Sequence, residues 1–129
     1  MHLIKRLTPW LLATLLAATT VLAGAGEARI AVAADGADAN ATVSAVAARA
    51  PYILIFDTHG TLLESHPNPV AANPGSAGPA LATWLGEKKI DMLIAGDFGA
   101  KLSPALAEQN INTVVARGPA NEAVKEVGQ

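Results

Sequence analysis

Residues 52–57 read YILIFD, which is the strongest strand pattern in the chain. A run of aromatic and β-branched residues is typical of a buried strand. After residues 58–60, a second run from Thr61 to Ser65 resumes the strand pattern. Because Gly60 between the two runs suits a tight antiparallel turn, we expect the whole stretch to form a β-hairpin with His59 at its tip.

Strand and helix patterns continue on both sides of this hairpin. Upstream, the apolar run from Arg29 to Ala34 ends at Asp35 and Gly36 and predicts a strand, whereas residues 37–48 predict a loop that allows a helical turn. Downstream, we expect a proline-rich loop from His66 to Pro79 and a helix with Pro79 as an early residue and Ser76 as its candidate cap. A strand from Ile90 to Ala95, a helix from about Lys101 to Gln109, a strand from Ile111 to Val115 and a helix that Pro119 opens should follow. This order predicts a mixed α/β sheet, with a hairpin near its N-terminus and flanking helices.

The composition predicts one small domain and excludes several kinds of site. The chain has 129 residues, of which 51% are hydrophobic, 16% charged and 4% aromatic, and it has no cysteine. The lack of cysteine excludes disulfides, thiolate zinc sites, cysteine-held iron–sulfur clusters and a cysteine nucleophile. A net charge of -2, without any basic block and with few aromatic residues, argues against a nucleic-acid partner.

The N-terminus has the pattern of a secretory signal. A start with Lys5 and Arg6 is followed by a largely apolar run to Leu22 and then by small residues. The apolar run is shorter than the roughly 20 residues that a membrane-spanning helix needs, and an uncleaved anchor is the alternative. We therefore predict a signal peptide over residues 1–25, a domain over residues 26–129 and a periplasmic or secreted location.

Many residues of this domain, in their order, also resemble a known family. They are Val43, Ser44, Arg49, Ala50, Pro51, Tyr52, Leu54, Ile55, Asp57, Asn68, Pro69, Gly75–Pro79, Asp91, Ile94–Gly96, Gly99 and Asn110. Over residues 29–127 the chain is similar to the dinitrogenase iron-molybdenum cofactor biosynthesis family, of the NifX and NafY type. The resemblance implies a ribonuclease H-like α/β fold with a five-stranded mixed sheet. It also implies a non-catalytic role in carrying an iron-molybdenum type cluster, its precursor or a molybdenum-containing anion.

One loop position departs from the family pattern. The resemblance implies a loop that reads Ser, Pro, His, Phe, Gly, Arg and Ala, whose histidine serves as a ligand to a metal or cluster. Here the aligned residues run from Ser44 to Ala50, and Val46 takes the place of that histidine. An aliphatic side chain has no lone pair, so Val46 cannot ligate a metal. Arg49 remains a candidate for contact with an anion, with an ordinary surface ion pair as its alternative.

Two glycine turns offer the best candidate binding site on physical grounds. One spans residues 75–78 at the start of a predicted helix, and the other spans residues 96–99 between a strand and a helix. Glycines let the backbone approach a ligand, and the N–H groups of a helix start favour an anion. The alternative is that the glycines only allow tight connections, and Asp97 in the second turn would repel an anion. The candidate binding residues are Ser44, Arg49, Gly75, Ser76, Gly78, Gly96 and Gly99.

His66 is the candidate metal ligand, because it adjoins the long loop and has Glu64 nearby. His59 and His66 lie at opposite ends of one predicted strand, roughly 20 Å apart at about 3.3 Å per residue, so one ion cannot join them. A solvated side chain is the alternative for each histidine.

No pattern in the chain predicts an enzyme. No serine has the glycine-flanked elbow of a nucleophile, and only Asp35 and Asp57 follow strands, whereas two-metal chemistry needs clustered carboxylates. We therefore expect an exported, non-catalytic binding protein. The alternative is a protein-interaction domain that keeps the fold without the ligand and uses the loop 66–79, which holds four of the eight prolines, as its contact surface.

Overall fold

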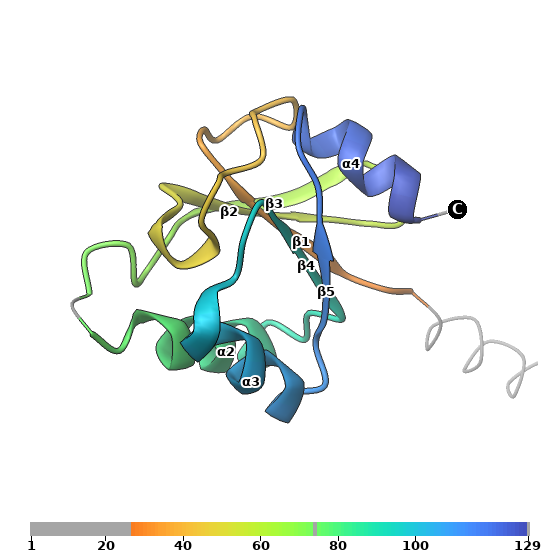
Figure 1. Cartoon of the computed structure of the whole chain (residues 1–129). Helices are drawn as coiled ribbons and strands as arrows, with labels where there is room; N and C mark the ends of the chain where they lie inside the picture. The colour runs from red at the N-terminus through yellow and green to blue at the C-terminus, as the bar shows by residue number, and fades with distance from the viewer. Residues whose placement is uncertain (1–26, 74, 129) are drawn as a thin grey trace, which may run out of the picture.

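The computed structural model describes residues 27–73 and 75–128 (Figure 1). Its elements, in chain order, are β1 (Ile30–Ala34), the 3₁₀ helix η1 (Ala47–Arg49), β2 (Tyr52–Phe56), β3 (Leu62–Pro67), α2 (Ala77–Glu87), β4 (Met92–Ala95), α3 (Gly99–Glu108), β5 (Asn112–Val115) and α4 (Ala120–Val127). Within this described part, no helix is long and apolar enough to cross a membrane. The predicted signal peptide, residues 1–25, lies outside the described residues.

The strands form one mixed sheet in the order β3-β2-β1-β4-β5. β2 and β3 make the expected antiparallel hairpin, in which Leu54 pairs with Ser65. β1 is antiparallel to β2, whereas β4 is parallel to β1 and β5 is parallel to β4. The helices α2 and α3 connect into β4 and β5, as parallel strands require a crossover. The predicted α/β fold with a five-stranded mixed sheet is confirmed.

Helices cover both faces of the sheet. Figure 1 shows α2 and α3 on one face and α4 on the other. Ile53 and Ile55 of β2 belong to the hydrophobic cluster beneath α2 and α3, and Leu54 and Phe56 belong to the cluster beneath α4. Every residue of β1 is buried, which explains why this strand is apolar without alternation.

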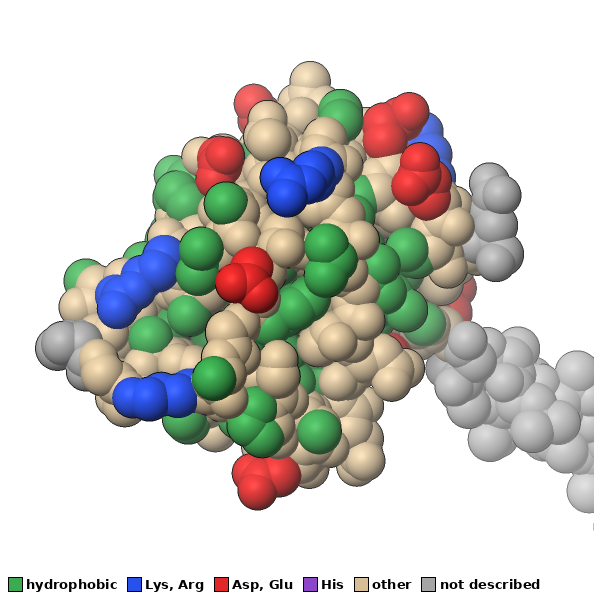
Figure 2. Space-filling view, in the orientation of Figure 1, with side chains coloured by type: hydrophobic (Ala, Val, Ile, Leu, Met, Phe, Trp, Pro, Cys, Tyr) green, Lys and Arg blue, Asp and Glu red, His purple; other side chains and the backbone are tan. Residues whose placement is uncertain are grey.

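The edge strand β5 is the least covered part of the sheet. It runs across the front of the molecule in Figure 1 with no helix drawn over it. In the same orientation, Figure 2 shows hydrophobic side chains gathered over the middle of this face. Val115 at the end of β5 is 64% exposed.

The end of the hairpin corrects one predicted boundary. β3 continues to Pro67, so His66 and Pro67 belong to the strand and not to the loop. The reason is that β2 is long enough to pair with both residues. A proline is tolerated there because β3 is an edge strand, whose outer N–H groups need no partner within the sheet.

Contacts across the chain order the loop after β1 and correct the predicted start of α4. The bridges Ala34–Val43 and Thr42–Pro119 order the segment 37–48 that is predicted as a loop, and η1 at its end is the helical turn that its sequence allows. Because Pro119 has the extended backbone of such a bridge, it precedes α4 and does not open it. As expected, α2 begins after Ser76, at Ala77, with Pro79 in its first turn, whereas α3 begins at Gly99, slightly before the predicted start near Lys101. Ser76 occupies the N-cap position of α2 but makes no capping hydrogen bond with its side chain.

Candidate functional site

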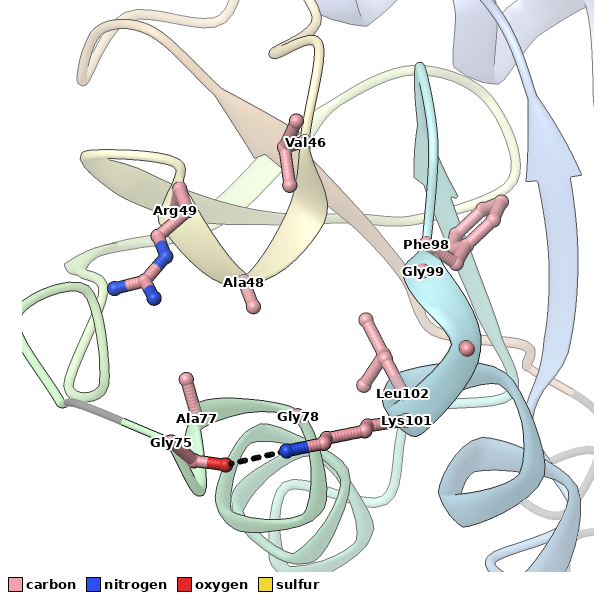
Figure 3. Close-up of a pocket in the computed structure, with 11 residues that line it drawn as sticks. Val46, Ala48, Arg49, Gly75, Ala77, Gly78, Phe98, Gly99, Lys101 and Leu102 are labelled. Atoms are coloured by element: carbon pink, nitrogen blue, oxygen red, sulfur yellow. Dashed lines mark hydrogen bonds between the residues drawn. The ribbon is translucent and has the colours of Figure 1, made fainter.

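A pocket of about 270 Å³ lies where η1 meets the first turns of α2 and α3. Figure 3 shows Arg49 on η1 across this pocket from Lys101 on α3. Its lining residues are Val46, Ala48, Arg49, Gly75, Ala77, Gly78, Phe98, Gly99, Ala100, Lys101 and Leu102. We call this hollow the helix-start pocket.

Backbone hydrogen bonds fix η1 beside the end of β4. The N–H of Gly96 donates to the carbonyl of Ser44 at 2.8 Å, and the N–H of Ala47 donates to the carbonyl of Asp97 at 2.9 Å. A Cβ atom at Gly96 would lie 2.9 Å from the Ala45 carbonyl oxygen, which is too close for any other residue to fit without movement. Gly96 therefore lets the loop that carries Arg49 pack against the turn after β4.

A second glycine brings the two helix starts together. A Cβ atom at Gly78 would lie 3.0 Å from the backbone nitrogen of Leu102, so only a residue without a side chain allows α2 and α3 to approach this closely. This approach places Lys101 beside the turn before α2. Its Nζ donates to the Gly75 carbonyl at 3.3 Å, the contact drawn as a dashed line in Figure 3.

The helix-start pocket is electropositive. Arg49 and Lys101 both line it, and no carboxylate occurs among its described lining residues. The nearby Asp97 carboxylate accepts a hydrogen bond from the N–H of Phe98 at 2.9 Å. Gly99, Ala100 and Lys101 also line the pocket with the first turn of α3, where N–H groups have no partner within the helix. The pocket can therefore attract an anion and offer it hydrogen-bond donors.

A comparison of the sequence with protein-family models decides the family. The model described as dinitrogenase iron-molybdenum cofactor matches residues 28–129, which is most of the chain. The chain belongs to the dinitrogenase iron-molybdenum cofactor family. Among proteins with curated descriptions, none matches it.

Solved structures share the fold of this cofactor-family chain. A Thermotoga protein, described as a candidate NifB protein and solved by NMR, is 30% identical, with a TM-score of 0.65 over 78% of this chain and 86% of its own. The apo orange protein of Desulfovibrio gigas is 24% identical, with a TM-score of 0.71 over 77% and 85% of the two chains, and supports the fold alone. A candidate dinitrogenase of Methanocaldococcus jannaschii is 10% identical, with a TM-score of 0.56 over 78% and 86%, and likewise supports only the fold.

The structure of this cofactor-family chain gathers some of the predicted site residues and separates others. Arg49, Gly75, Gly78 and Gly99 line the helix-start pocket, whereas Ser44, Ser76 and Gly96 do not. Ser44 is buried, and its backbone N–H and carbonyl bond to Ala33 and Gly96. Ser76 is exposed before α2. The alternative interpretation, that the glycines allow tight connections, also has support: Gly75 and Gly99 have a positive φ of 81°, which favours glycine. Gly78 and Gly96 allow close packing against Leu102 and Ala45.

Sequence reasoning missed Lys101. A cation in the first turn of a helix is unfavourable, because it lies at the positive end of the helix dipole. That unusual position was the available signal of a role beyond helix formation. Val46, at the position where the family resemblance implies a histidine, also lines the pocket and is 43% exposed.

His66 lies away from the helix-start pocket, in a cluster of charged residues around Glu64. Its Nε2 is 2.7 Å from Glu64 Oε1, and its ring packs edge-on against Trp84 with centroids 5.2 Å apart. Arg29 donates to Glu64 Oε2 at 2.8 Å, and Lys88 Nζ lies 3.7 Å from Oε1. Within residues 27–73 and 75–128, no three histidine or acidic side chains are grouped so as to hold a metal ion. Metal ligation by His66 stays a prediction.

Proposed function

We propose that this chain is a non-catalytic carrier that binds an anionic metal cluster or a molybdenum-containing anion in the helix-start pocket. The observation that carries the proposal is the placement of Arg49 and Lys101 around one pocket without an opposing carboxylate among the described lining residues. Membership of the dinitrogenase iron-molybdenum cofactor family supports a metal cluster as the cargo.

The lining residues suit a complete anion better than a bare metal ion. No described side chain of the pocket is an imidazole, a thiolate or a carboxylate, which are the usual protein ligands of metals. A cluster whose own sulfide or oxide ligands complete its coordination needs only charge, N–H donors and shape from the protein. Arg49, Lys101 and the backbone at Gly99 supply the first two.

Molybdenum uptake tests the proposed cargo site. Purified protein is dialysed to equilibrium against molybdate or tetrathiomolybdate, and bound molybdenum is measured by mass spectrometry. We expect saturable binding of at least one probe, and about tenfold weaker binding after either Arg49→Glu or Lys101→Glu, because each change removes a charge-assisted hydrogen bond and adds repulsion. Arg117→Glu, at an exposed residue outside the pocket, is the matched control for net charge.

Two outcomes would contradict this placement of the site. One is that neither probe binds the unmodified protein. The other is that Arg117→Glu weakens uptake as much as the pocket variants, which would show a general effect of charge.

We also propose that the carrier acts outside the cytosol. The order of a charged start, an apolar run and small residues over positions 1–25 supports this location. Cell fractionation with N-terminal sequencing should find the protein exported and beginning near residue 26. Recovery of the intact chain from the cytosol would contradict export without affecting the proposed cargo site.

A further inference from the structure

Asp97 lies where the two segments that carry the cations of the helix-start pocket meet. Its carbonyl oxygen accepts a hydrogen bond from the N–H of Ala47 at 2.9 Å, which fixes η1 and with it Arg49. Its carboxylate accepts a hydrogen bond from the N–H of Phe98 at 2.9 Å, immediately before α3 begins. Phe98 and Gly99, which follow it in the chain, line the pocket and are labelled in Figure 3. Asp97 therefore lies at the edge of the pocket, although it is not one of the lining residues.

No neighbour in the described part of the chain neutralises the charge of Asp97. Among residues 27–73 and 75–128, no ion pair within 4 Å includes this carboxylate, and the residue is exposed. Glu64 differs, because Arg29 lies 2.8 Å from its carboxylate. The negative charge of Asp97 is thus free to act on whatever binds beside it.

The place of Asp97 in the chain limits its distance from an anion in the pocket. Two residues span at most about 7 Å, so the backbone of Asp97 lies within about that distance of Gly99, whose backbone lines the pocket. The Debye length at physiological ionic strength is about 8 Å, so salt only partly screens a charge at this range. A carboxylate before the first turn of α3 also competes with an anion for the positive end of the helix dipole.

We propose that Asp97 keeps the affinity of the helix-start pocket low enough for the cargo to leave, because it repels the anion that Arg49 and Lys101 attract. This inference rests on the proposed cargo site. No described side chain of the pocket is a usual metal ligand, so charge and N–H donors alone hold the cargo. A carrier must also release what it binds, and a fixed opposing charge weakens binding without removing a donor.

The variant Asp97→Asn separates the charge of this side chain from its hydrogen bond. The amide oxygen of asparagine can still accept from the N–H of Phe98, so the turn before α3 keeps its geometry. Asp38→Asn, at an exposed loop residue outside the pocket, is the control because it changes the net charge by the same amount. Equilibrium dialysis of each purified protein against molybdate and tetrathiomolybdate gives the dissociation constants.

The measurement is made in about 0.1 M and about 1 M salt, where the Debye length is about 10 Å and about 3 Å. In the lower salt, Asp97→Asn should bind at least one probe at least about threefold more tightly than the unmodified protein, because one like charge near the anion is removed. In the higher salt, this gain should fall below about twofold. Asp38→Asn should stay within about twofold of the unmodified protein in both. Thermal unfolding checks that both variants are folded.

Several results would overturn the inference. If the unmodified protein binds a probe and Asp97→Asn binds it no more tightly, the proposed cargo site stands but Asp97 does not set its affinity. An equal gain for Asp38→Asn would show a general effect of net charge. A gain that is the same in both salt concentrations would show a change of shape and not of charge. If neither the unmodified protein nor Asp97→Asn binds a probe, the proposed cargo site fails and this inference fails with it.

Discussion

At the scale of single residues, Glu64 is the charge on which several side chains converge. Arg29, His66 and Lys88 all lie within ion-pair distance of its carboxylate. The hydrogen bond from Arg29, followed by that from His66, lowers the pKa of Glu64 from 4.5 to about 2. A lowered pKa means that the ionised carboxylate of Glu64 is more stable in the folded protein than in the unfolded chain. The stabilisation is therefore complete above pH 4.5 and disappears as the pH falls towards about 2.

Glu64→Gln should lower the free energy of unfolding at neutral pH by about 1 kcal/mol, a modest value because solvent screens this partly exposed cluster. Urea unfolding at a series of pH values measures the change. The difference between variant and unmodified protein should shrink below pH 4.5. Asp38→Asn, at an exposed loop residue away from any helix start, is the control and should change little. A difference that stays constant down to acidic pH would contradict the assigned cause.

A substitution at Gly96 tests the close approach of the Ala45 backbone to the turn after β4, which positions η1. Gly96→Ala would force its Cβ against the Ala45 carbonyl, 2.9 Å away, and should cost about 1–3 kcal/mol as the backbone shifts. Gly36→Ala is the matched control, because its Cβ would meet Ala41 at an ordinary 3.4 Å. Urea unfolding of both variants measures the two costs. Equal stability of the two variants would show that the loop before η1 can move freely away from Gly96.

At the scale of elements, the charge of Lys101 in the first turn of α3 has opposite effects on helix stability and on anion binding. Its positive charge is unfavourable for the helix dipole but favourable for an anion in the helix-start pocket. Lys101→Gln should therefore raise the free energy of unfolding by about 0.5 kcal/mol while it weakens molybdenum uptake. Urea unfolding and equilibrium dialysis measure the two effects on the same sample. If uptake is unchanged, Lys101 does not contact the cargo.

The hairpin and the helices could be predicted from local patterns. The apolar run of β2 and the glycine of the turn identify the hairpin without knowledge of the rest of the chain. The end of β3 at Pro67 could not be found in this way, because it depends on how far β2 extends opposite it. The sequence allowed a helical turn within residues 37–48 but could not place η1, because bridges to Ala34 and Pro119 order the segment before it.

At the scale of the whole molecule, the short helix α4 covers one face of the sheet. Leu54 and Phe56 are fully buried beneath it, in a cluster with Ala123 and Val124. A chain that ends at Pro119 should lose its cooperative thermal transition, because this apolar face would be exposed to water. Differential scanning calorimetry measures the transition, and a chain that ends at Gly128 is the control. A cooperative transition in the shorter chain would show that α4 is dispensable.

The candidate site shows the same division between sequence and structure. Arg49, Gly75, Gly78 and Gly99 were recognisable because a loop cation and glycines at the start of a helix are typical of anion-binding sites. Lys101 was not, because its reach to Gly75 depends on how closely α2 and α3 pack.

Patterns along the sequence were enough to predict the order of strands and helices, the family and the two glycine turns. These features depend on neighbouring residues, whose periodicity and backbone preferences can be read along the chain. The folded chain was needed to show which candidates share a pocket, and there Ser44 and Gly96 make backbone contacts outside the pocket. The physical reason is that a pocket depends on distances between segments far apart in sequence, and close packing of whole elements sets those distances.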